Sequence, residues 1–327
     1  MSDPVRIGIL GAGAVAKYAL IAPARRDNGI VVASVAARDA NRAAAYAAAN
    51  GIPRASTYDE MLADPEIEAV YVATPNSLHC EWTLKALDAG KAVLCEKPLG
   101  SNAAEARRMA DAPGLLVEAL HWRYHPQSDR MRQLIEGGAI GALTEIDFTF
   151  LVPGKYFQPD DIRFRRDLSG GAVMDLGYYA ISFLRFVAGA EPEAILRAEA
   201  VQIAPDVDGA MKAEMRFPGG CIARMNLSLV DEADDFTIAA EITGERGSIS
   251  IVNPVHPQNG GGLDVIVDGA ARNYPPEKPA TYDWQARAFA RNVREGAPVL
   301  TTAREGAAIM KVIDDVYRAA SMNPRGV

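Results

Sequence analysis

A glycine-rich turn directly after an apolar strand is the feature that most restricts how this chain can fold. The segment VRIGIL (residues 5–10) predicts a buried strand, and GAGAVA (residues 11–16) follows it, ahead of an alanine-rich helical segment. Gly11 permits the tight turn, Gly13 lets a pyrophosphate approach the backbone, and Ala16 keeps helix and strand close together. The motif and its position after the first strand predict a dinucleotide site rather than a plain tight turn.

The helix after this turn is expected to extend to about Arg26 and to contribute to the same site. Its first N–H groups have no partner within the helix, and the positive end of its dipole attracts phosphate groups. We therefore place Ala14 and Val15 in the dinucleotide site together with the two glycines.

Apolar strands alternate with helices through the first 120 residues. Strands are expected at 30–37, 69–74, 92–95 and 115–120, with helices at 40–50, 77–90 and 102–110 between them. Near-continuous apolar strands in this alternation are typical of a parallel sheet that is covered on both faces. The first part of the chain is therefore predicted to be a doubly wound α/β domain.

The pattern changes after about residue 125, where longer strands are joined by short turns. Strands are expected at 142–152, 194–203, 209–217, 221–230, 236–244 and 247–252, and helices at about 126–136, 173–187, 282–295 and 302–320. Gly219 and Gly220 predict a hairpin turn. Successive strands with short turns indicate an antiparallel sheet in a second domain, with the boundary near 121–125.

An arginine follows the second strand, at the position that distinguishes the two nicotinamide dinucleotides. An acidic residue there would bind the 2′-hydroxyl of NAD, but this chain has Ala36, Ala37 and Arg38. A guanidinium can pair with a 2′-phosphate and stack on adenine. Asp39 is expected to cap the next helix. The sequence thus favours NADP over NAD, unless Arg38 is only a solvated surface charge.

The segment ATPNSLH (residues 73–79) follows the third strand. Ligands of parallel sheets lie at the carboxyl ends of the strands, so Thr74, Pro75 and Asn76 are expected to face the nicotinamide half of the dinucleotide, unless they form only a loop. His79 opens the next helix and has no Cys, His or carboxylate near it at a spacing that suits a metal. We expect it to support the cofactor pocket and expect no metal site.

The strand AVLC (residues 92–95) ends in Glu96 and Lys97. The tripeptide Glu-Lys-Pro also occurs within PPEKPA (residues 275–280), but there no strand precedes it. The tripeptide alone is therefore weak evidence, and the argument depends on the position of Lys97 at the end of a strand. At that position its ammonium group would stand beside the nicotinamide and a substrate hydroxyl.

A second set of polar groups is expected on the helix near 173–187. Asp175 and Tyr179 are four residues apart, which places both on one helix face. With a lysine from the other domain they would form a site that moves protons on an alcohol. The alternative is that Asp175 caps the helix and the aromatic side chains belong to the core.

Charge and cysteine content restrict the partners and the compartment. The net charge of −8 argues against a nucleic-acid or anionic-membrane surface. Cys80, Cys95 and Cys221 are scattered and lack metal spacing, which is typical of a reduced, cytoplasmic protein. The run DDIRFRRD (residues 160–167) could bring an arginine, Arg163 or Arg165, to an acidic substrate, or could simply be solvated.

Together these motifs resemble the glucose–fructose oxidoreductase, inositol dehydrogenase and rhizopine-catabolism (Gfo/Idh/MocA) superfamily. The resemblance rests on GILGAGAVA, VATPNSLH, LCEKPLG and GGAVMDLGYY, in that order along the chain. The segments AARD and EALHWRYHP are most similar to the dimeric dihydrodiol dehydrogenase and NADP-dependent D-xylose dehydrogenase branch.

The resemblance implies a Rossmann domain over residues 1–123. It further implies an α+β domain over 124–327 with a large open, mainly antiparallel sheet that binds substrate and often forms a dimer. The last helix is able to pack back on the first domain. The expected partners are a small sugar, polyol or diol and a second copy of the chain.

The resemblance also implies roles for single residues. Lys97 would be the catalytic lysine, Glu96 its neighbour in the cofactor pocket, and Arg123 part of the wall between cofactor and substrate. Many relatives carry histidine at the position of Tyr179, whereas the dihydrodiol branch carries tyrosine. Whether Tyr179 or the adjacent Tyr178 faces the substrate stays open.

The resulting hypothesis is reversible hydride transfer between NADP and a carbinol carbon, with Lys97, Tyr179 and Asp175 as the catalytic residues. Lys97 would favour the Tyr179 phenolate and relay its proton. Two alternatives are a redox-assisted glycosidase with tightly bound NAD and a non-catalytic regulator that binds the cofactor. Arg38 argues against the first, and the second would leave the catalytic residues without a task.

Overall fold

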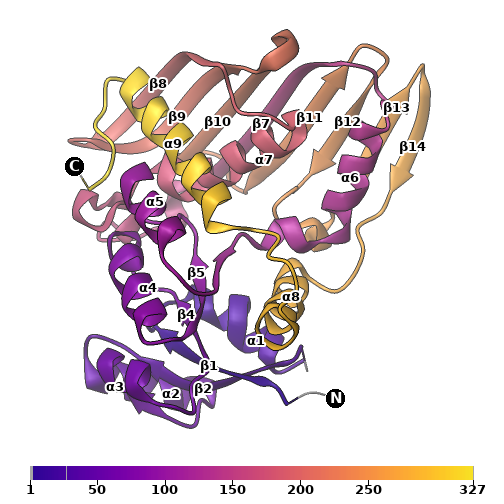
Figure 1. Ribbon diagram of the computed structural model, residues 1–327. Helices are drawn as coiled ribbons and strands as arrows, with labels where there is room; N and C mark the ends of the chain where they lie inside the picture. The colour runs from indigo at the N-terminus through magenta and orange to yellow at the C-terminus, as the bar shows by residue number, and fades with distance from the viewer. Residues whose placement is uncertain (1–2, 27, 327) are drawn as a thin grey trace. The chain divides into compact units, whose positions relative to one another are not determined.

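The computed structural model describes residues 3–26 and 28–326 (Figure 1). The chain divides into two compact units, and each unit contains two segments that are distant in sequence. The first unit comprises Met1–Tyr124 and Thr281–Ala308, and the second comprises His125–Ala280 and Ile309–Val327.

The first unit is built on a six-stranded parallel sheet with the strand order β3-β2-β1-β4-β5-β6. Its elements are β1 (Val5–Leu10), η1 (Lys17–Ile21), α1 (Ala22–Ala24), β2 (Ile30–Ala36), α2 (Ala40–Asn50), β3 (Ala55–Ser56), α3 (Tyr58–Ala63), β4 (Ala69–Val72), η2 (Asn76–Leu78), α4 (His79–Asp88), β5 (Ala92–Glu96), α5 (Ala103–Asp111), β6 (Leu116–Ala119), η3 (His121–Tyr124) and α8 (Thr281–Glu295). This order confirms the predicted doubly wound α/β fold.

Helix starts in this unit follow local capping signals. Asp39 accepts a hydrogen bond from the Arg42 backbone N–H (2.7 Å) and so begins α2, as expected. Asn102 caps α5 in the same way, and Thr57 forms a capping box at the start of α3. Side chains close to each helix start are therefore positioned by short-range chemistry.

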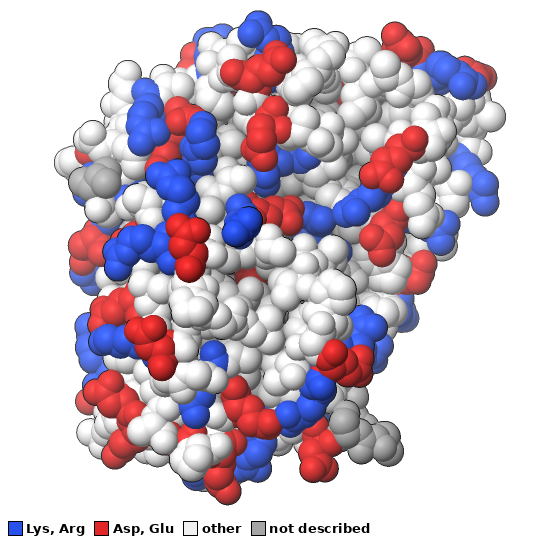
Figure 2. Space-filling model, viewed as in Figure 1, with Lys and Arg blue, Asp and Glu red and all other residues white. Residues whose placement is uncertain are grey.

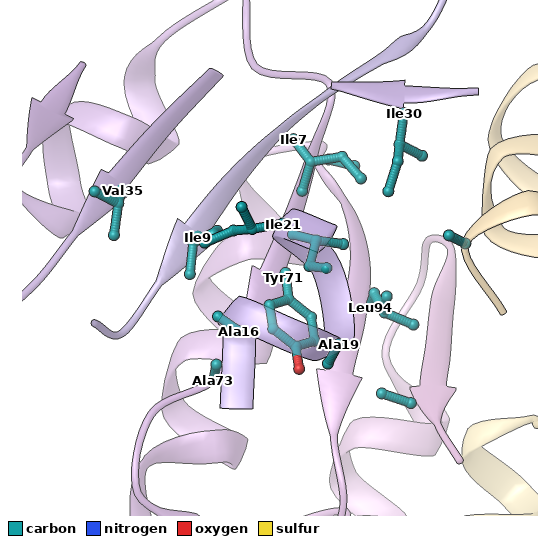
Figure 3. Packing of buried hydrophobic residues seen from close by; sticks show 14 of the residues in the cluster. Ile7, Ile9, Ala16, Ala19, Ile21, Ile30, Val35, Tyr71, Ala73 and Leu94 are labelled. Atoms are coloured by element: carbon teal, nitrogen blue, oxygen red, sulfur yellow. The ribbon is translucent and has the colours of Figure 1, made fainter. Parts of the chain in front are cut away.

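The apolar core of the first unit forms where the sheet meets the surrounding helices (Figure 3). Ile7 and Ile9 of β1, Ile21 and Tyr71 lie in one cluster of buried side chains. Residues of α8 complete this cluster although they lie more than 200 positions after these four residues; they are Tyr282, Ala286, Phe289 and Ala290. Tertiary packing thus adds a C-terminal helix to the N-terminal domain.

The helical segment after the glycine turn differs from the expected regular helix. Lys17–Ile21 is π-helical, and the Ala22 N–H donates to the carbonyl of Lys17. Pro23 follows at once. Proline has no N–H to donate, and its ring clashes with the carbonyl four residues earlier, which favours a widened turn at this point.

The second unit contains an eight-stranded sheet with the order β14-β13-β12-β11-β7-β10-β9-β8. Its elements include α6 (Pro126–Glu136), β7 (Leu143–Pro153), η7 (Val173–Gly177), α7 (Tyr178–Ala188), β8 (Ala194–Ala204), β9 (Val207–Arg216), β10 (Ile222–Asp231), β11 (Thr237–Gly244), β12 (Gly247–Val252), β13 (Leu263–Val267) and β14 (Ala270–Tyr274). All neighbouring strands are antiparallel except β7 and β10, which confirms the mainly antiparallel sheet. Helix α9 (Ala303–Ala319) contributes residues to both units.

Two strands of this sheet, β13 and β14, were not identified from the sequence. They form a hairpin whose turn residues, Asp268 and Gly269, both have positive φ (48° and 83°). An Asp-Gly pair between apolar segments is a strong signal for such a hairpin. The signal was present in the sequence and was overlooked.

Charged side chains of both signs are mixed on the face drawn in Figure 2. On α9, for example, Asp315 accepts hydrogen bonds from Lys311 (2.7 Å) and Arg318 (3.0 Å). Exposed pairs of this kind contribute little to stability, which therefore depends on the buried cores. Among the described helices, none combines the length and the apolar character that a bilayer crossing requires.

Candidate functional site

The glycine turn after β1 packs against the backbone at the end of β4. Gly11 has a φ of 109°, and a Cβ atom there would lie 2.5 Å from the carbonyl oxygen of Ala73. A Cβ atom on Gly13 would lie 3.3 Å from the same oxygen. Ala14 is exposed and Val15 half-buried. The turn therefore has its glycines where the backbone is most crowded and its outer residues open to a ligand.

Side chains of α2 hold this turn from its other side. Tyr46 donates its hydroxyl hydrogen to the carbonyl of Gly13 (2.9 Å), and Arg42 Nη2 donates to the carbonyl of Ala12 (3.2 Å). Burial raises the pKa of Tyr46, so its hydroxyl stays protonated and able to donate. Neither residue was expected from the sequence, because the contacts span about 30 residues.

Two arginines that follow β2 lie near the phenol of Tyr58 at the start of α3. Burial raises the pKa of Tyr58, whereas the positive charges of Arg38 and Arg42 lower it, and the Arg38 backbone is hydrogen-bonded to the same hydroxyl. Arg38 is exposed, as a phosphate ligand must be. Asp39, which caps α2, lies between the two arginines in sequence, so the start of this helix fixes the backbone positions of both. Arg42 is thus a second cationic residue beside the predicted one.

The loop after β4 contains a buried hydroxyl that the described protein groups do not satisfy. Thr74 is 7% exposed, and its Oγ1 has no hydrogen-bond partner among the described residues. Pro75 and Asn76 are half-buried beside it. A buried polar atom without a partner is costly, and a bound ligand that supplies one removes that cost. The residues present therefore fit a dinucleotide at this edge of the sheet.

His79 connects this loop to the loop that contains the lysine. Its Nε2 lies 2.9 Å from the carbonyl oxygen of Thr74, and its Nδ1 lies 2.9 Å from that of Pro98. Burial lowers the pKa of His79, and the nearby Lys97 charge lowers it further. A neutral ring donates to only one of the two carbonyls. With a backbone oxygen 2.9 Å from each ring nitrogen, His79 bridges the two loops.

Glu96 is the last residue of β5, which is the neighbour of β4 in the sheet, and Lys97 follows it directly. Glu96 is buried and accepts a short hydrogen bond from the hydroxyl of Tyr71 on β4. Burial and the Glu96 carboxylate raise the pKa of Tyr71 well above its ordinary value, so Tyr71 remains the donor. Lys97 is half-buried. The strand end thus holds Glu96 in place and leaves part of Lys97 accessible.

Arg123 lies in an ion pair. It is 6% exposed, and its Nη1 lies 2.6 Å from Glu305 Oε1. The guanidinium also lies 5.5 Å from the ring of Trp122. Glu305 is 182 residues away in sequence, so no sequence pattern indicated this partner.

In the second unit, Asp175 lies on the π-helical segment η7 rather than on the predicted regular helix. Its Oδ2 accepts a hydrogen bond from Arg163 Nε (2.6 Å), and the same guanidinium donates to Asp161 Oδ1 (3.1 Å). The two carboxylates raise the pKa of Arg163, which therefore stays charged. Arg165 is paired with Asp167 instead. The sequence left both arginines open, and the structure pairs each with an aspartate.

The two adjacent tyrosines of α7 differ in exposure. Tyr178 is 0% exposed, whereas Tyr179 is 8% exposed and its ring lies 6.2 Å from that of Phe150. A group that handles a substrate proton must be reachable, so this difference favours Tyr179. The structure thus places the residues that are predicted to bind the cofactor in the first unit, and Asp175 and Tyr179 in the second.

The remaining reactive side chains give no competing site in the described part of the chain. Cys80, Cys95 and Cys221 are buried, and burial raises the pKa of each thiol. A protonated, inaccessible thiol is a poor nucleophile. Across residues 3–26 and 28–326, no three His, Cys, Asp or Glu side chains are grouped so that they could hold a metal ion.

Comparisons with known proteins agree with this geometry. Residues 5–113 match the family described as "Oxidoreductase family, NAD-binding Rossmann fold", and residues 128–250 match the GFO/IDH/MocA C-terminal domain. The chain is 33% identical over 320 residues to D-xylose 1-dehydrogenase (NADP(+)) 2 of Haloferax volcanii, which covers 96% of each chain.

It is also 32% identical over 281 residues to trans-1,2-dihydrobenzene-1,2-diol dehydrogenase of Mus musculus, covering 83% of this chain and 80% of that one. Aldose-aldose oxidoreductase from Caulobacter crescentus, whose structure was solved with glycerol, has a TM-score of 0.86 and 25% identity over 97% of this chain and 98% of its own. Both domains therefore match, over nearly the whole length, and the chain belongs to the GFO/IDH/MocA family of NAD(P)-dependent oxidoreductases.

Proposed function

We propose that this protein is an NADP-dependent oxidoreductase that transfers a hydride between the nicotinamide and a carbinol carbon of a sugar, polyol or cyclic diol. The observation that carries the proposal is the set of groups at the carboxyl ends of β1, β4 and β5, which are neighbours in the sheet. These groups are the glycine turn, the unsatisfied hydroxyl of Thr74 and the accessible Lys97. Ligands of this fold bind at that edge.

NADP is favoured over NAD by two positive charges. Arg38 and Arg42 both lie near Tyr58 at the start of α3, and Arg38 follows β2, where an acidic residue would otherwise bind the ribose hydroxyls of NAD. A 2′-phosphate placed between two guanidinium groups gains charge-assisted hydrogen bonds. The similarity to an NADP(+) D-xylose dehydrogenase supports the same choice.

In the proposed reaction, the hydroxyl proton of the substrate moves to or from Tyr179 while a bound nicotinamide accepts or supplies the hydride. A free phenol has a pKa of about 10 and is a poor base at neutral pH. A nearby cation stabilises the phenolate. We assign that cation to Lys97, which then passes the proton onward.

Asp175 is proposed to accept a hydrogen bond from a substrate hydroxyl. The Arg163 guanidinium, 2.6 Å from Asp175 Oδ2, fixes the orientation of the carboxylate. An ionised carboxylate cannot donate a proton but can orient an alcohol. Asp175 therefore positions the substrate, and Tyr179 handles its proton.

The face of the second sheet that carries Arg224 is proposed to bind a second copy of the chain. Arg224 of β10 pairs with Glu145 (2.9 Å), Glu214 (3.0 Å) and Asp147 (3.5 Å) and lines a hollow together with residues of β7, β8 and β9. Strand β8 exposes apolar side chains, including Val201. A sheet face with this mixture of paired charge and apolar surface suits a symmetric homodimer. The reduced, buried cysteines support a cytoplasmic location.

A dehydrogenase screen with both cofactors tests the proposal. The purified protein is assayed on pentoses, hexoses, inositols and aromatic dihydrodiols with NADP and with NAD. We expect turnover with a carbinol substrate and a higher kcat/KM with NADP. Tightly bound NAD that persists through purification, together with glycoside cleavage and no net NADPH formation, would instead support the redox-assisted glycosidase.

A further inference from the structure

A fully buried ion pair lies in the second unit, outside the residues assigned above. Arg325, Asp208 and Tyr317 are each 0% exposed. Arg325 Nη2 donates to Asp208 Oδ1 (2.6 Å), Tyr317 Oη donates to the same oxygen (2.9 Å), and the guanidinium lies 4.2 Å from the Tyr317 ring. Charged side chains are rarely buried so completely unless they are paired.

The same cluster holds the backbone of the glycine turn that precedes η7. Arg325 Nε donates to the carbonyl of Gly170 (2.7 Å), and Asp208 Oδ2 accepts from the N–H of Val173 (2.7 Å). Gly171, between these two contacts, has a φ of 129°, and a Cβ atom there would lie 2.2 Å from Asp208 Oδ1. The turn is therefore packed directly onto the ion pair.

This turn determines where the proposed substrate residues begin. The carbonyl of Gly171 accepts from the N–H of Asp175 (3.1 Å), and its N–H donates to the carbonyl of Arg163 (2.8 Å). The two partners of Gly171 are the residues that form the 2.6 Å ion pair. Tyr179 follows on α7, four residues after Asp175. A displacement of the turn would therefore move all of these groups together.

We propose that Arg325, acting with Asp208 and Tyr317, is a positioning residue that holds the helix carrying Asp175 and Tyr179 in its reactive place. The inference rests on the proposed function of those two residues. A buried ion pair is by itself weak evidence for stability, because well-packed apolar residues often replace one without loss. This pair is different in that both partners bind the backbone of one turn, so an apolar replacement would lose the turn's position.

The test uses the full-length protein with Arg325→Met, the double variant Arg325→Met/Asp208→Asn, and Arg318→Met as a matched control on the exposed face of α9. The amide introduced by Asp208→Asn would still offer an oxygen to the Val173 N–H but would carry no uncompensated charge. Three quantities are measured: thermal stability, deuterium exchange of the amides in 170–177, and kcat with the dissociation constant of NADPH.

In Arg325→Met we expect faster exchange in 170–177 and a kcat lower by about 10- to 100-fold, since misplacing a reacting group by roughly 1 Å costs about that much. NADPH affinity should hardly change. The double variant should regain thermal stability. Its amides in 170–177 should still exchange fast, and its kcat should stay low. Arg318→Met should match the wild type in all three. If Arg325→Met folds poorly, Arg325→Lys keeps the charge without the contact to Gly170 and should show the same exchange and kcat defects.

Wild-type exchange and kcat in a folded Arg325 variant would overturn the proposal. Recovery of turnover together with stability in the double variant would also overturn it, because Arg325 would then only balance a buried charge. Absence of turnover in the wild type on every substrate would refute the proposed function instead. In that case the exchange measurement still decides whether Arg325 positions the turn.

Discussion

Removal of Arg38 or Arg42 tests the cofactor assignment, because the structure gives the two arginines different second tasks. Arg38 is exposed at the end of β2, where its charge acts on Tyr58. Arg42 also donates to the carbonyl of Ala12 within the glycine turn (3.2 Å). Arg38→Ala should therefore affect only binding of the 2′-phosphate, whereas Arg42→Ala should also loosen the turn that is proposed to bind the pyrophosphate of either cofactor.

The expected magnitudes follow from the hydrogen bonds that each substitution removes. A charge-assisted hydrogen bond contributes about 1.5–3 kcal/mol, so Arg38→Ala should raise the Michaelis constant for NADP by about 10- to 100-fold and leave that for NAD nearly unchanged. A hydrogen bond to a neutral carbonyl, such as that from Arg42 to Ala12, contributes about 0.5–1.5 kcal/mol. Arg42→Ala should therefore raise the constant for NAD by about 2- to 12-fold and that for NADP by more.

Steady-state kinetics with both cofactors at saturating substrate measure these effects. Arg107→Ala on the exposed side of α5 provides the matched control and should change neither constant. An equal rise for NADP and NAD in Arg38→Ala would refute the assignment of that residue to the 2′-phosphate. An unchanged NAD constant in Arg42→Ala would show that its contact with the turn does not contribute to binding.

Three further predictions concern catalysis, pH and assembly. Lys97→Met and Tyr179→Phe should each lower turnover by about 10²- to 10⁴-fold with little change in NADPH affinity, and the double variant should be hardly worse than either single variant. Lys278→Met, in the second Glu-Lys-Pro, is the control and should leave turnover unchanged. Normal turnover in Lys97→Met would contradict the mechanism. Burial raises the pKa of Asp208 from 3.8 to about 6, so the folded state binds more protons than the unfolded state between these values. The free energy of unfolding should thus fall by about 2 kcal/mol as the pH rises from 4 to 6, and urea titrations should show this slope in the wild type but not in Asp208→Asn. Light scattering should show a dimer of the wild type. Arg224→Ala should weaken this dimer because it leaves carboxylates on the sheet face unpaired. A wild-type monomer at micromolar concentration would contradict the proposed interface.

Sequence was sufficient wherever the cause of a structural feature is local. The Asp39 cap, the hairpin at Gly219 and Gly220, and the parallel order of the first sheet depend on contacts between near neighbours or on periodicity. The hairpin at Asp268 and Gly269 had an equally local signal that was overlooked. The π-helical start of the segment with Asp175 lacked such a signal, because the turn before it is held from elsewhere in the chain.

The residues of the candidate site also separate into local and distant ones. Sequence alone placed the glycine turn, Thr74 and Lys97 at strand ends, since strand order and motif position are written in the pattern of apolar residues. Only the tertiary structure showed that Tyr71 binds Glu96 and that Arg325 reaches the turn before Asp175. These contacts join residues 25 and 155 positions apart, and no local propensity records which distant side chain will fill a buried space. Burial decides them, because a polar group removed from water requires a partner and packing determines which one is within reach.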